Sequence, residues 1–299
     1  MWISLALISA FLLGIYDVFK KISLNNNAVL PVLFATTVTA AAIVTPIIIL
    51  SPIYPDFFKA AQIYVPPITT TEHIMIFAKA VIVVSGWVFA FYALKNLPIT
   101  IVTPIRATGP LWTLIGAIFI FQERLNLIQW LGVLVTLCFF YLLSTAGKLE
   151  GINFKRNKWI YFIIIGTLLG SSSGLWDKFI LKTIDRVAVQ AWFSFYQVVV
   201  MLPAMILFRW IKKKENRSPF EWRWAIPMIA IFLLFADYAY FYSLSIPESM
   251  ISIVSALRRG GVIVAFVIGA FLFKEQNIKQ KGIYLLGILV GILLISLGS

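Results

Sequence analysis

Residues 14–21 read GIYDVFKK and residues 174–181 read GLWDKFIL, so a glycine, an aspartate and a phenylalanine recur at equal spacing 160 positions later. Arg106 and Arg258 also correspond, 152 positions apart. Sequence matches that recur in the same order indicate an internal duplication. Duplication is frequent in transporters, in which the substrate site lies between the two halves. Two more pairs of stretches match in that order: FYAL at 91–94 with FYSL at 241–244, and IFIFQE at 118–123 with AFLFKE at 270–275.

The composition places both copies in a lipid bilayer. Of the 299 residues, 61% are apolar and 12% are charged, and the mean hydropathy is +0.94. Apolar runs of about 20 residues match a hydrocarbon core roughly 30 Å thick. The sequence therefore predicts an all-α polytopic membrane protein, with ten transmembrane helices as two inverted five-helix repeats over residues 1–147 and 148–299. The predicted spans are 3–22, 29–50, 73–94, 98–121, 126–145, 159–181, 188–210, 224–245, 248–273 and 279–298.

Several classes of function are not expected from this composition. Little chain remains between the spans, which argues against a soluble catalytic domain. The first span lacks a basic leader and has a repeat partner, so we expect it to stay in the mature fold. Without a Walker loop, a GxGxxG turn or Cys/His metal spacing, we expect no cofactor. The net charge of +13 lies mainly in short loops, which favours anionic lipid rather than nucleic acid as the partner.

The loop charges are uneven between the two faces of the membrane. Because five spans per repeat is an odd number, the second repeat is predicted to insert upside down relative to the first. Basic loops tend to stay in the cytoplasm, so both termini are predicted on the extracytoplasmic side, with a bacterial inner membrane as the expected location. Fifteen basic loop residues are predicted on the face away from the termini: Lys20, Lys21, Lys95, Lys148, Lys155, Arg156, Lys158, Lys212, Lys213, Lys214, Arg217, Arg223, Lys274, Lys279 and Lys281. Four are predicted on the face of the termini: Lys59, Arg124, Lys182 and Arg186.

The pattern resembles the drug/metabolite transporter superfamily with EamA-type repeats. The resemblance rests on a Gly-x-x-Asp stretch closing the first span, a Tyr-Ala-Leu turn before the fourth and Phe-Gln-Glu-Arg-Leu at its end, and it covers nearly the whole chain. It implies ten helices, inverted repeats and a central cavity lined by spans 1, 3, 4, 6, 8 and 9. Similar proteins move small solutes such as amino acids, sugars and drugs. Many of them are thought to keep both termini in the cytoplasm, opposite to the orientation that the charges predict here.

Ionisable side chains inside the spans are the first candidates for function. Each costs about 2.5–3.5 kcal/mol at the bilayer centre on insertion scales, so it needs a partner or a cavity. Helix rise places Asp17 and Arg106 at similar depths from one face, and Asp177 and Arg258 from the other. The duplication thus predicts one Asp–Arg pair in each half of the membrane. The pairs are interpreted either as gates and substrate sites or as structural charge neutralisation, in which Asp17 pairs locally with Lys20 or Lys21.

Several other sequence features in the predicted spans allow a structural and a functional interpretation. Lys79 is expected to snorkel to the interface, and Pro98, Pro104 and Pro110 either kink the fourth span or break it beside a cavity. The GSSSG stretch at 170–174 serves helix packing or a polar cavity wall. Aromatic residues form an interfacial belt or contact the ligand. The candidate substrate-binding or gating residues are Asp17, Arg106, Asp177, Arg258, Arg259, Asp237, Tyr92, Trp176 and Tyr240.

The sequence predicts a secondary transporter rather than an enzyme. The expected substrate is a small polar or amphipathic metabolite, with an amino-acid-like zwitterion favoured, moved by alternating access. Further expected partners are membrane lipid and a possible coupling ion. The alternative is a membrane-embedded lipid-handling protein or enzyme. Substrate identity, direction of transport, coupling ion and oligomeric state stay open.

Overall fold

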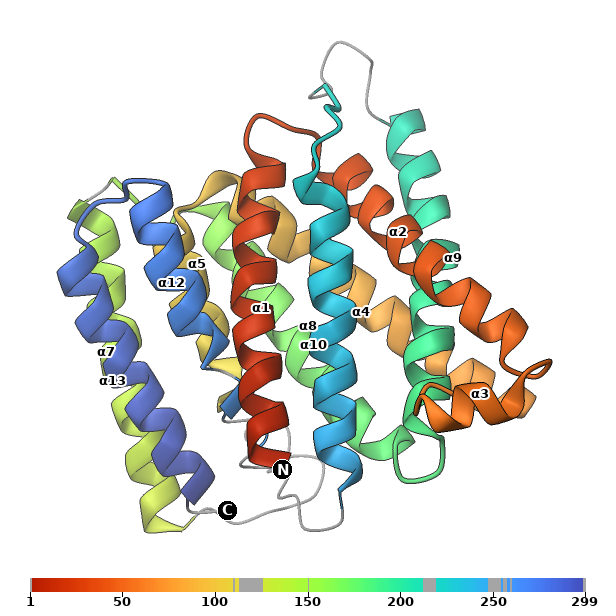
Figure 1. Cartoon of the computed structure of the whole chain (residues 1–299). Coiled ribbons are helices and arrows are strands. Elements are labelled where there is room, and N and C mark those ends of the chain that lie inside the picture. Colours follow the sequence, from red (N-terminus) through yellow and green to blue (C-terminus); the bar gives the residue numbers. More distant parts are fainter. Residues whose placement is uncertain are drawn as a thin grey trace.

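The computed structural model describes residues 2–109, 111–112, 126–149, 151–211, 219–246, 254, 257–258 and 260–297. Within these ranges every regular element is a helix, which agrees with the predicted all-α class (Figure 1). The helices in chain order are α1 (Trp2–Leu24), α2 (Val29–Leu50), α3 (Pro55–Ala60), α4 (Thr70–Asn96), α5 (Ile99–Ala107), α7 (Leu127–Leu149), α8 (Lys158–Ile180), α9 (Arg186–Ile211), α10 (Ala225–Ser245), α12 (Gly261–Leu272) and α13 (Ile278–Leu297).

The long helices coincide with predicted spans. Six of them, α1, α2, α4, α8, α9 and α10, are long and apolar enough to cross a membrane. The predicted span 29–50 has the bounds of α2, and 73–94 lies within α4. Parts of the predicted fourth and ninth spans fall outside the described residues, so the number ten stays a prediction. The loop at 51–72 contains the short helix α3, which was not predicted.

Local signals fix both ends of α4. At its start, Thr69 and Glu72 form a capping box, in which each side chain accepts a hydrogen bond from the other residue's backbone amide. At its end, Leu97 has extended backbone angles of φ −123° and ψ 154°. Pro98 follows, and the residue before a proline is disfavoured in the helical region. The chain therefore breaks between α4 and α5.

Most of the helix pairs with the largest contacts are preserved when the two halves of the chain are exchanged. The pair α1–α10 has the counterpart α8–α4, the pair α1–α12 has α8–α5, and the pair α4–α9 has α10–α2. The pairs α2–α9, α5–α12 and α7–α13 map onto themselves. In Figure 1, α1 and α10 lie side by side in the centre, with α7 and α13 at one end and α2 and α9 at the other. A duplicated fold requires this pattern.

Both termini lie on one side of the molecule, here called the terminal face, and the opposite side is the far face (Figure 1). Helix α1 runs from the terminal face to the far face, and α10 runs back beside it. Two hydrogen bonds support this placement: Ser243 Oγ, near the end of α10, donates to the carbonyl of Trp2 at 2.9 Å, and Arg223, before α10, donates to the carbonyl of Ile22 at 2.9 Å.

Glycines let two helix pairs approach backbone to backbone. A Cβ added to Gly14 of α1 would lie 2.7 Å from the carbonyl oxygen of Gly261 on α12. A Cβ on Gly166 of α8 would lie 3.0 Å from the carbonyl oxygen of Gly86 on α4. Small residues allow such close approach inside membranes. By contrast, a Cβ placed on Gly174 has no described atom within 4 Å outside its own turn of helix.

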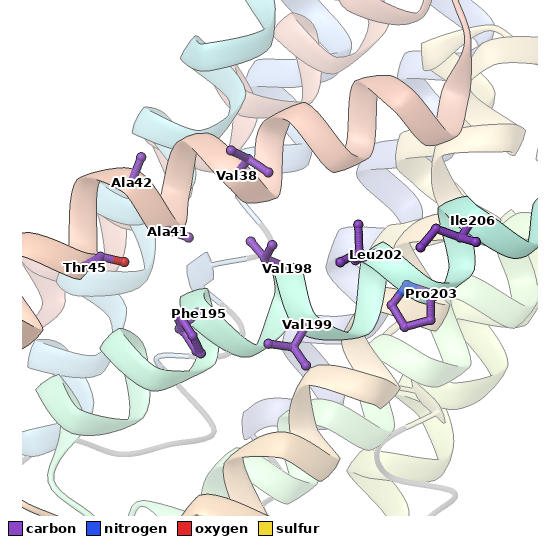
Figure 2. Close-up of a pocket in the computed structure, with 10 residues that line it drawn as sticks. All are labelled: Val38, Ala41, Ala42, Thr45, Phe195, Val198, Val199, Leu202, Pro203 and Ile206. Carbon is purple, nitrogen blue, oxygen red and sulfur yellow. The ribbon is translucent and has the colours of Figure 1, made fainter. Parts of the chain in front are cut away.

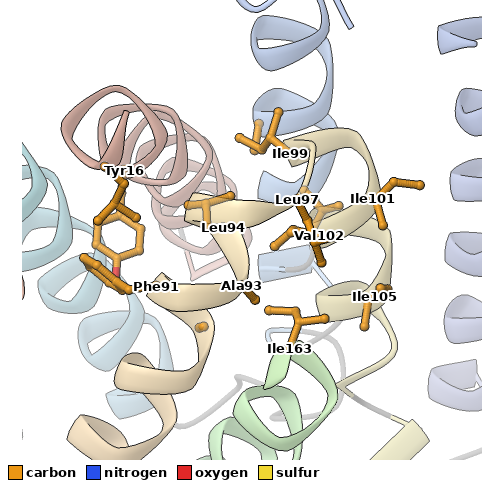
Figure 3. Close-up of a cluster of buried hydrophobic side chains, with 14 of the residues drawn as sticks. Tyr16, Phe91, Ala93, Leu94, Leu97, Ile99, Ile101, Val102, Ile105 and Ile163 are labelled. Atoms are coloured by element: carbon orange, nitrogen blue, oxygen red, sulfur yellow. The ribbon is translucent and has the colours of Figure 1, made fainter. Parts of the chain in front are cut away.

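A buried apolar cluster surrounds the α4–α5 turn and holds it in place. Figure 3 shows Leu94, Leu97 and Ile99 packed around this turn, with Tyr16 of α1 and Ile163 of α8 among the neighbouring cluster members. All five side chains are buried. The turn is the start of the segment that carries Arg106, so the cluster fixes the position from which that arginine reaches α1.

Candidate functional site

An ion cluster lies between α1 and α5. Arg106 Nη1 donates to both carboxylate oxygens of Asp17, at 2.5 and 2.6 Å, and Lys20 Nζ donates to Asp17 Oδ1 at 3.0 Å. Asp17 and Lys20 are buried, whereas the Arg106 side chain is 30% exposed. The Asp17–Arg106 pair predicted from the duplication is therefore present, together with a local pair to Lys20.

Lys20 and Lys21 have separate partners. The Lys20 ammonium lies over the ring faces of Tyr16 and Phe91, 4.4 and 4.8 Å from their centroids. Lys21 donates instead to the carbonyl oxygens of Leu94 and Leu97 at the end of α4, at 2.7 and 2.6 Å. The alternative in which Lys21 neutralises Asp17 is therefore wrong, and Lys20 takes that role.

The second repeat pairs its charges differently from the prediction. Asp177 pairs with Lys79 at 2.6 Å, and Arg258 pairs with Asp237, so the expected direct Asp177–Arg258 pair is not formed. The side chains of Lys79 and Asp177 are only 3% and 11% exposed, which makes the predicted snorkelling of Lys79 wrong as well. The physical reason is helix packing: α4 lies directly against α8, so Lys79 reaches Asp177 within the bundle.

The three ion pairs belong to one electrostatic array. The ring of Tyr240 links two of them, since it lies against the Arg258 guanidinium and against Phe241, whose ring faces the Lys79 ammonium. Tyr16, which contacts Lys20, lies within electrostatic range of Asp237 and Arg258. Asp177 interacts with Asp237 and Arg258 in addition to Lys79. Buried charges persist when each has a partner. The array thus links α1, α4, α5, α8 and α10 through the bundle interior.

Both arginines sit beside interruptions of helical structure. Arg106 is in the last turn of α5, which ends at Ala107, and Arg258 lies just before the start of α12. The carbonyl of Gly109, beyond the end of α5, accepts a hydrogen bond of 2.8 Å from Ser171 of α8. Discontinuous helices in transporters line substrate and ion sites. The GSSSG stretch thus contacts the end of α5 through the buried Ser171, whose hydroxyl donates to this carbonyl.

The predicted aromatic candidates divide between the array and the periphery. Tyr240 joins the array, because the Arg258 guanidinium lies 3.9 Å from its ring centroid. Trp176 neighbours Asp177 in sequence, but its Nε1 donates to the carbonyl of Met75 at 3.0 Å. Tyr92 stacks on Trp159 near the far face and, in the described part of the chain, makes no contact with the ion pairs. Arg259 and Pro110 lie outside the described residues.

Residues of the second repeat bond to the N-terminus of α5, which was not predicted. Pro98 at the N-cap has no side-chain acceptor for the free amides of this helix. The Glu275 carboxylate accepts from the amides of Ile99 and Thr100 at 2.8 and 3.0 Å and also from the Thr100 hydroxyl. The buried Lys281 ammonium donates to the Thr100 hydroxyl at 2.8 Å. Glu275, just beyond the end of α12, is thus a cap supplied across the repeat boundary.

A groove of about 920 Å³ lies apart from the charged array, on the flank formed by α2 and α9 (Figure 2). Its residues lie near the middle of both helices and are apolar apart from Thr45. None of the predicted site residues lines this groove, so the volume marks an apolar flank rather than the charged site. The lining residues are Val38, Ala41, Ala42, Thr45, Phe195, Val198, Val199, Leu202, Pro203 and Ile206.

Metal binding finds no support in the described part of the chain. Within it, no three His, Cys, Asp or Glu side chains gather in a way that could hold a metal ion. Cys138 is the one cysteine of the sequence and is exposed on α7. The chemistry available to the array is therefore that of carboxylates, ammonium groups, guanidinium groups and tyrosine rings.

Comparisons with known proteins agree with the duplicated fold. The model of the EamA-like transporter family matches the chain twice, over residues 1–145 and 157–297. A solved structure described only as "Crystal structure of protein" shares 16% sequence identity, with a TM-score of 0.66 over 99% of this chain and 96% of that chain. At this identity the likeness concerns the fold alone. A search of curated protein sequences finds no match.

Proposed function

The chain belongs to the EamA-like transporter family, and we propose that it is a secondary transporter that moves a small polar or amphipathic metabolite by alternating access. The observation that carries this proposal is the Asp17–Arg106 pair between α1 and the interrupted α5. Charged groups inside a membrane are costly and mark pathways when they face a bundle interior. Family members are transporters, so no catalytic role is proposed.

An amino-acid-like zwitterion is the favoured substrate. The planar guanidinium of Arg106 matches a carboxylate, and the oxygens of Asp17 that Arg106 releases can accept an ammonium group. A zwitterion can therefore insert between the two residues without changing the net charge of the site. Phosphorylated solutes are the competing class, because arginine also binds phosphate.

The ion pairs are proposed to act as gates on two sides of a midplane site. The Asp17–Arg106 pair serves the far face, and the Asp177–Lys79 pair serves the terminal face. Asp17→Asn is expected to favour opening at the far face, and Asp177→Asn at the terminal face. Labelling of cysteines introduced near each face, in a Cys138→Ala background, measures this preference. Equal labelling from both sides in the two variants would reject the gate assignment.

Transport itself is tested in proteoliposomes that contain only this protein. A metabolite library is first screened for ligands that raise the melting temperature, because a ligand that binds only the folded state stabilises it. Each hit is then measured for counterflow against a preloaded, unlabelled pool. Accumulation of a labelled hit supports the proposal, and hits that bind without any counterflow contradict it.

A lipid-handling role is the second candidate, and the groove between α2 and α9 favours it. The apolar wall of the groove at mid-span suits an acyl chain. The Asp17–Arg106 pair, which could attract a lipid headgroup, lies in another part of the bundle. Scrambling of fluorescent phospholipid in the same proteoliposomes distinguishes the two functions. Scrambling without solute counterflow would favour the lipid role.

The termini are proposed to be extracytoplasmic. The described basic residues that are exposed support this, because five belong to the predicted cytoplasmic set and two to the opposite set. The five are Lys155, Arg156, Lys158, Lys274 and Lys279, and the two are Lys59 and Lys182. Lys20 and Lys281, also counted in that set, are buried and contribute less to the asymmetry than the sequence implied. A reporter that fluoresces only in the cytoplasm, fused after Ser299, is expected to stay dark. Bright fluorescence from the intact fusion would reverse the orientation.

A further inference from the structure

The two repeats share an Asp–Arg motif but surround it with different charges. Asp17 corresponds to Asp177, and Arg106 to Arg258. The additional ion-pair partners are not duplicated. When the two repeats are aligned, each of these residues corresponds to an uncharged residue in the other repeat. In these alignments Lys20 falls on Ile180, Lys79 on Ile229 and Asp237 on Trp87.

These additional charged residues decide whether an aspartate or arginine of the motif still has an ion-pair partner when the two are not paired with each other. In the second repeat the motif pair is apart, and both members have substitutes: Asp177 has Lys79 and Arg258 has Asp237. In the first repeat Asp17 has Lys20 as a substitute, at 3.0 Å. Among the described residues, Asp17 is the one hydrogen-bond and ion-pair partner of Arg106. Opening of the first pair would leave this one guanidinium uncompensated.

The charge balance of the array points in the same direction. Among the described residues, the three acids of the array, Asp17, Asp177 and Asp237, face four bases, so this set of residues has one excess positive charge. The bases are Lys20, Lys79, Arg106 and Arg258. An unpaired charge is unfavourable where the dielectric constant is low. The excess is most easily neutralised at the most exposed base, and Arg106, 30% exposed, exceeds the other three.

Arg106 also has donors to spare. Both of its bonds to Asp17 come from the single nitrogen Nη1, whereas a guanidinium carries five N–H donors in a planar fork. Nε and Nη2 therefore remain for a ligand with two oxygens. The buried Lys20, held between Asp17 and two aromatic rings, has no comparable freedom.

Building on the proposed transport function, we propose that a carboxylate of the substrate docks on the free edge of Arg106 and replaces Asp17 there as the far-face gate opens. The substrate thereby supplies the acid that the second repeat has built in as Asp237. Arg258 keeps the acid Asp237 on Nη2 while its motif partner is apart, so it does not require a substrate carboxylate in the wild-type protein, although its Nε has no hydrogen-bond partner among the described residues. An empty site would open with an unpaired guanidinium, so opening at the far face requires the carboxylate.

The test uses the full chain in detergent micelles and three small probes of similar size: propionate, alanine and ethylamine. At about 50 mM, well above a millimolar Kd, propionate and alanine are expected to raise the melting temperature of the wild type, and ethylamine is not. Arg106→Gln is expected to weaken both responses at least about tenfold, as loss of a charge-assisted bond implies. Arg106→Lys retains the charge without the fork and checks that the loss is not due to misfolding, with an intermediate response expected.

The second repeat supplies matched controls. Arg156→Gln, at an exposed arginine outside the array, is expected to leave the propionate response unchanged. Asp237→Asn frees Arg258 and is expected to add a second propionate response. An ethylamine response equal to that of propionate, an unaltered response in Arg106→Gln, or no response of the wild type to either carboxylate would overturn the inference. A stronger response to inorganic phosphate than to propionate would reject the carboxylate as the bound group. Counterflow of uncharged or cationic solutes would overturn this inference while leaving the transport function intact.

Discussion

Lys79→Met is expected to lower the free energy of unfolding by about 3–5 kcal/mol, the usual cost of removing one partner of a buried ion pair. The Lys79 ammonium lies 2.6 Å from Asp177, and the two side chains are 3% and 11% exposed. Apart from this ion pair, Asp177 Oδ1 has no hydrogen-bond partner among the described residues. Methionine therefore leaves a buried carboxylate without its direct ion-pair partner.

The reverse change, Asp177→Asn, is expected to cost less. The Lys79 ammonium would keep the ring faces of Phe193 and Phe241, 4.4 and 4.7 Å away, and a cation–π contact contributes about 0.5–2 kcal/mol. The asparagine oxygen can also accept a hydrogen bond from it. Combining Lys79→Met with Asp177→Leu is expected to restore most of the stability, because apolar replacement of a buried pair is often neutral or stabilising.

Thermal unfolding followed by tryptophan fluorescence in detergent measures all three variants. A large domain loses about 2–4 °C per kcal/mol, so Lys79→Met is expected to unfold roughly 10 °C below the wild type. Lys182→Met, at an exposed lysine, is the control for loss of a positive charge. Equal shifts for Lys79→Met and Asp177→Asn, or a double variant less stable than Lys79→Met, would refute the reasoning.

Three smaller changes probe other contacts. Gly14→Ala is expected to cost about 1–3 kcal/mol through overpacking, since its Cβ would meet the α12 backbone, whereas the Cβ of Gly174→Ala has no described atom within 4 Å outside its own turn of helix and should be tolerated; equal melting temperatures for the two would contradict this. Glu275→Ala removes the cap of α5, at a cost of about 1 kcal/mol, and should speed hydrogen exchange in its first turn; unchanged exchange counts against the cap. Arg223→Ala should speed exchange only near the end of α1, where its guanidinium bonds two carbonyls, and a uniform change would contradict this local role.

The helices and one ion pair could be predicted because their signals are local or repeated. Continuous apolar runs give span positions without knowledge of neighbours, and the predicted span 29–50 has the bounds of α2. The Asp17–Arg106 pair followed from depth, since residues at equal depth on neighbouring helices can meet. Depth is available from sequence because helix rise is fixed.

The other pairs depend on lateral neighbours, which the sequence does not specify. Lys79 lies where snorkelling is usual, yet the packing of α4 against α8 gives it a buried acid nearby. Helices that are apolar on most sides carry little information on which side faces which neighbour. The sequence does contain a signal for these pairs. Lys79 and Asp237 have opposite charges, and each aligns with an uncharged residue in the other repeat. Two such complementary substitutions predict that Asp177 and Arg258 pair with them instead of with each other.

The far face is joined mainly by side chains that bond to main-chain carbonyls. Lys21 bonds to Leu94 and Leu97, Lys95 to Asn27, and Arg223 to Ile22 and Asn25. A carbonyl is present whichever amino acid occupies the position, so the accepting residues can diverge freely while the joint persists. Selection then needs to maintain only the few donors. Contacts of this kind can therefore persist while the accepting residues change.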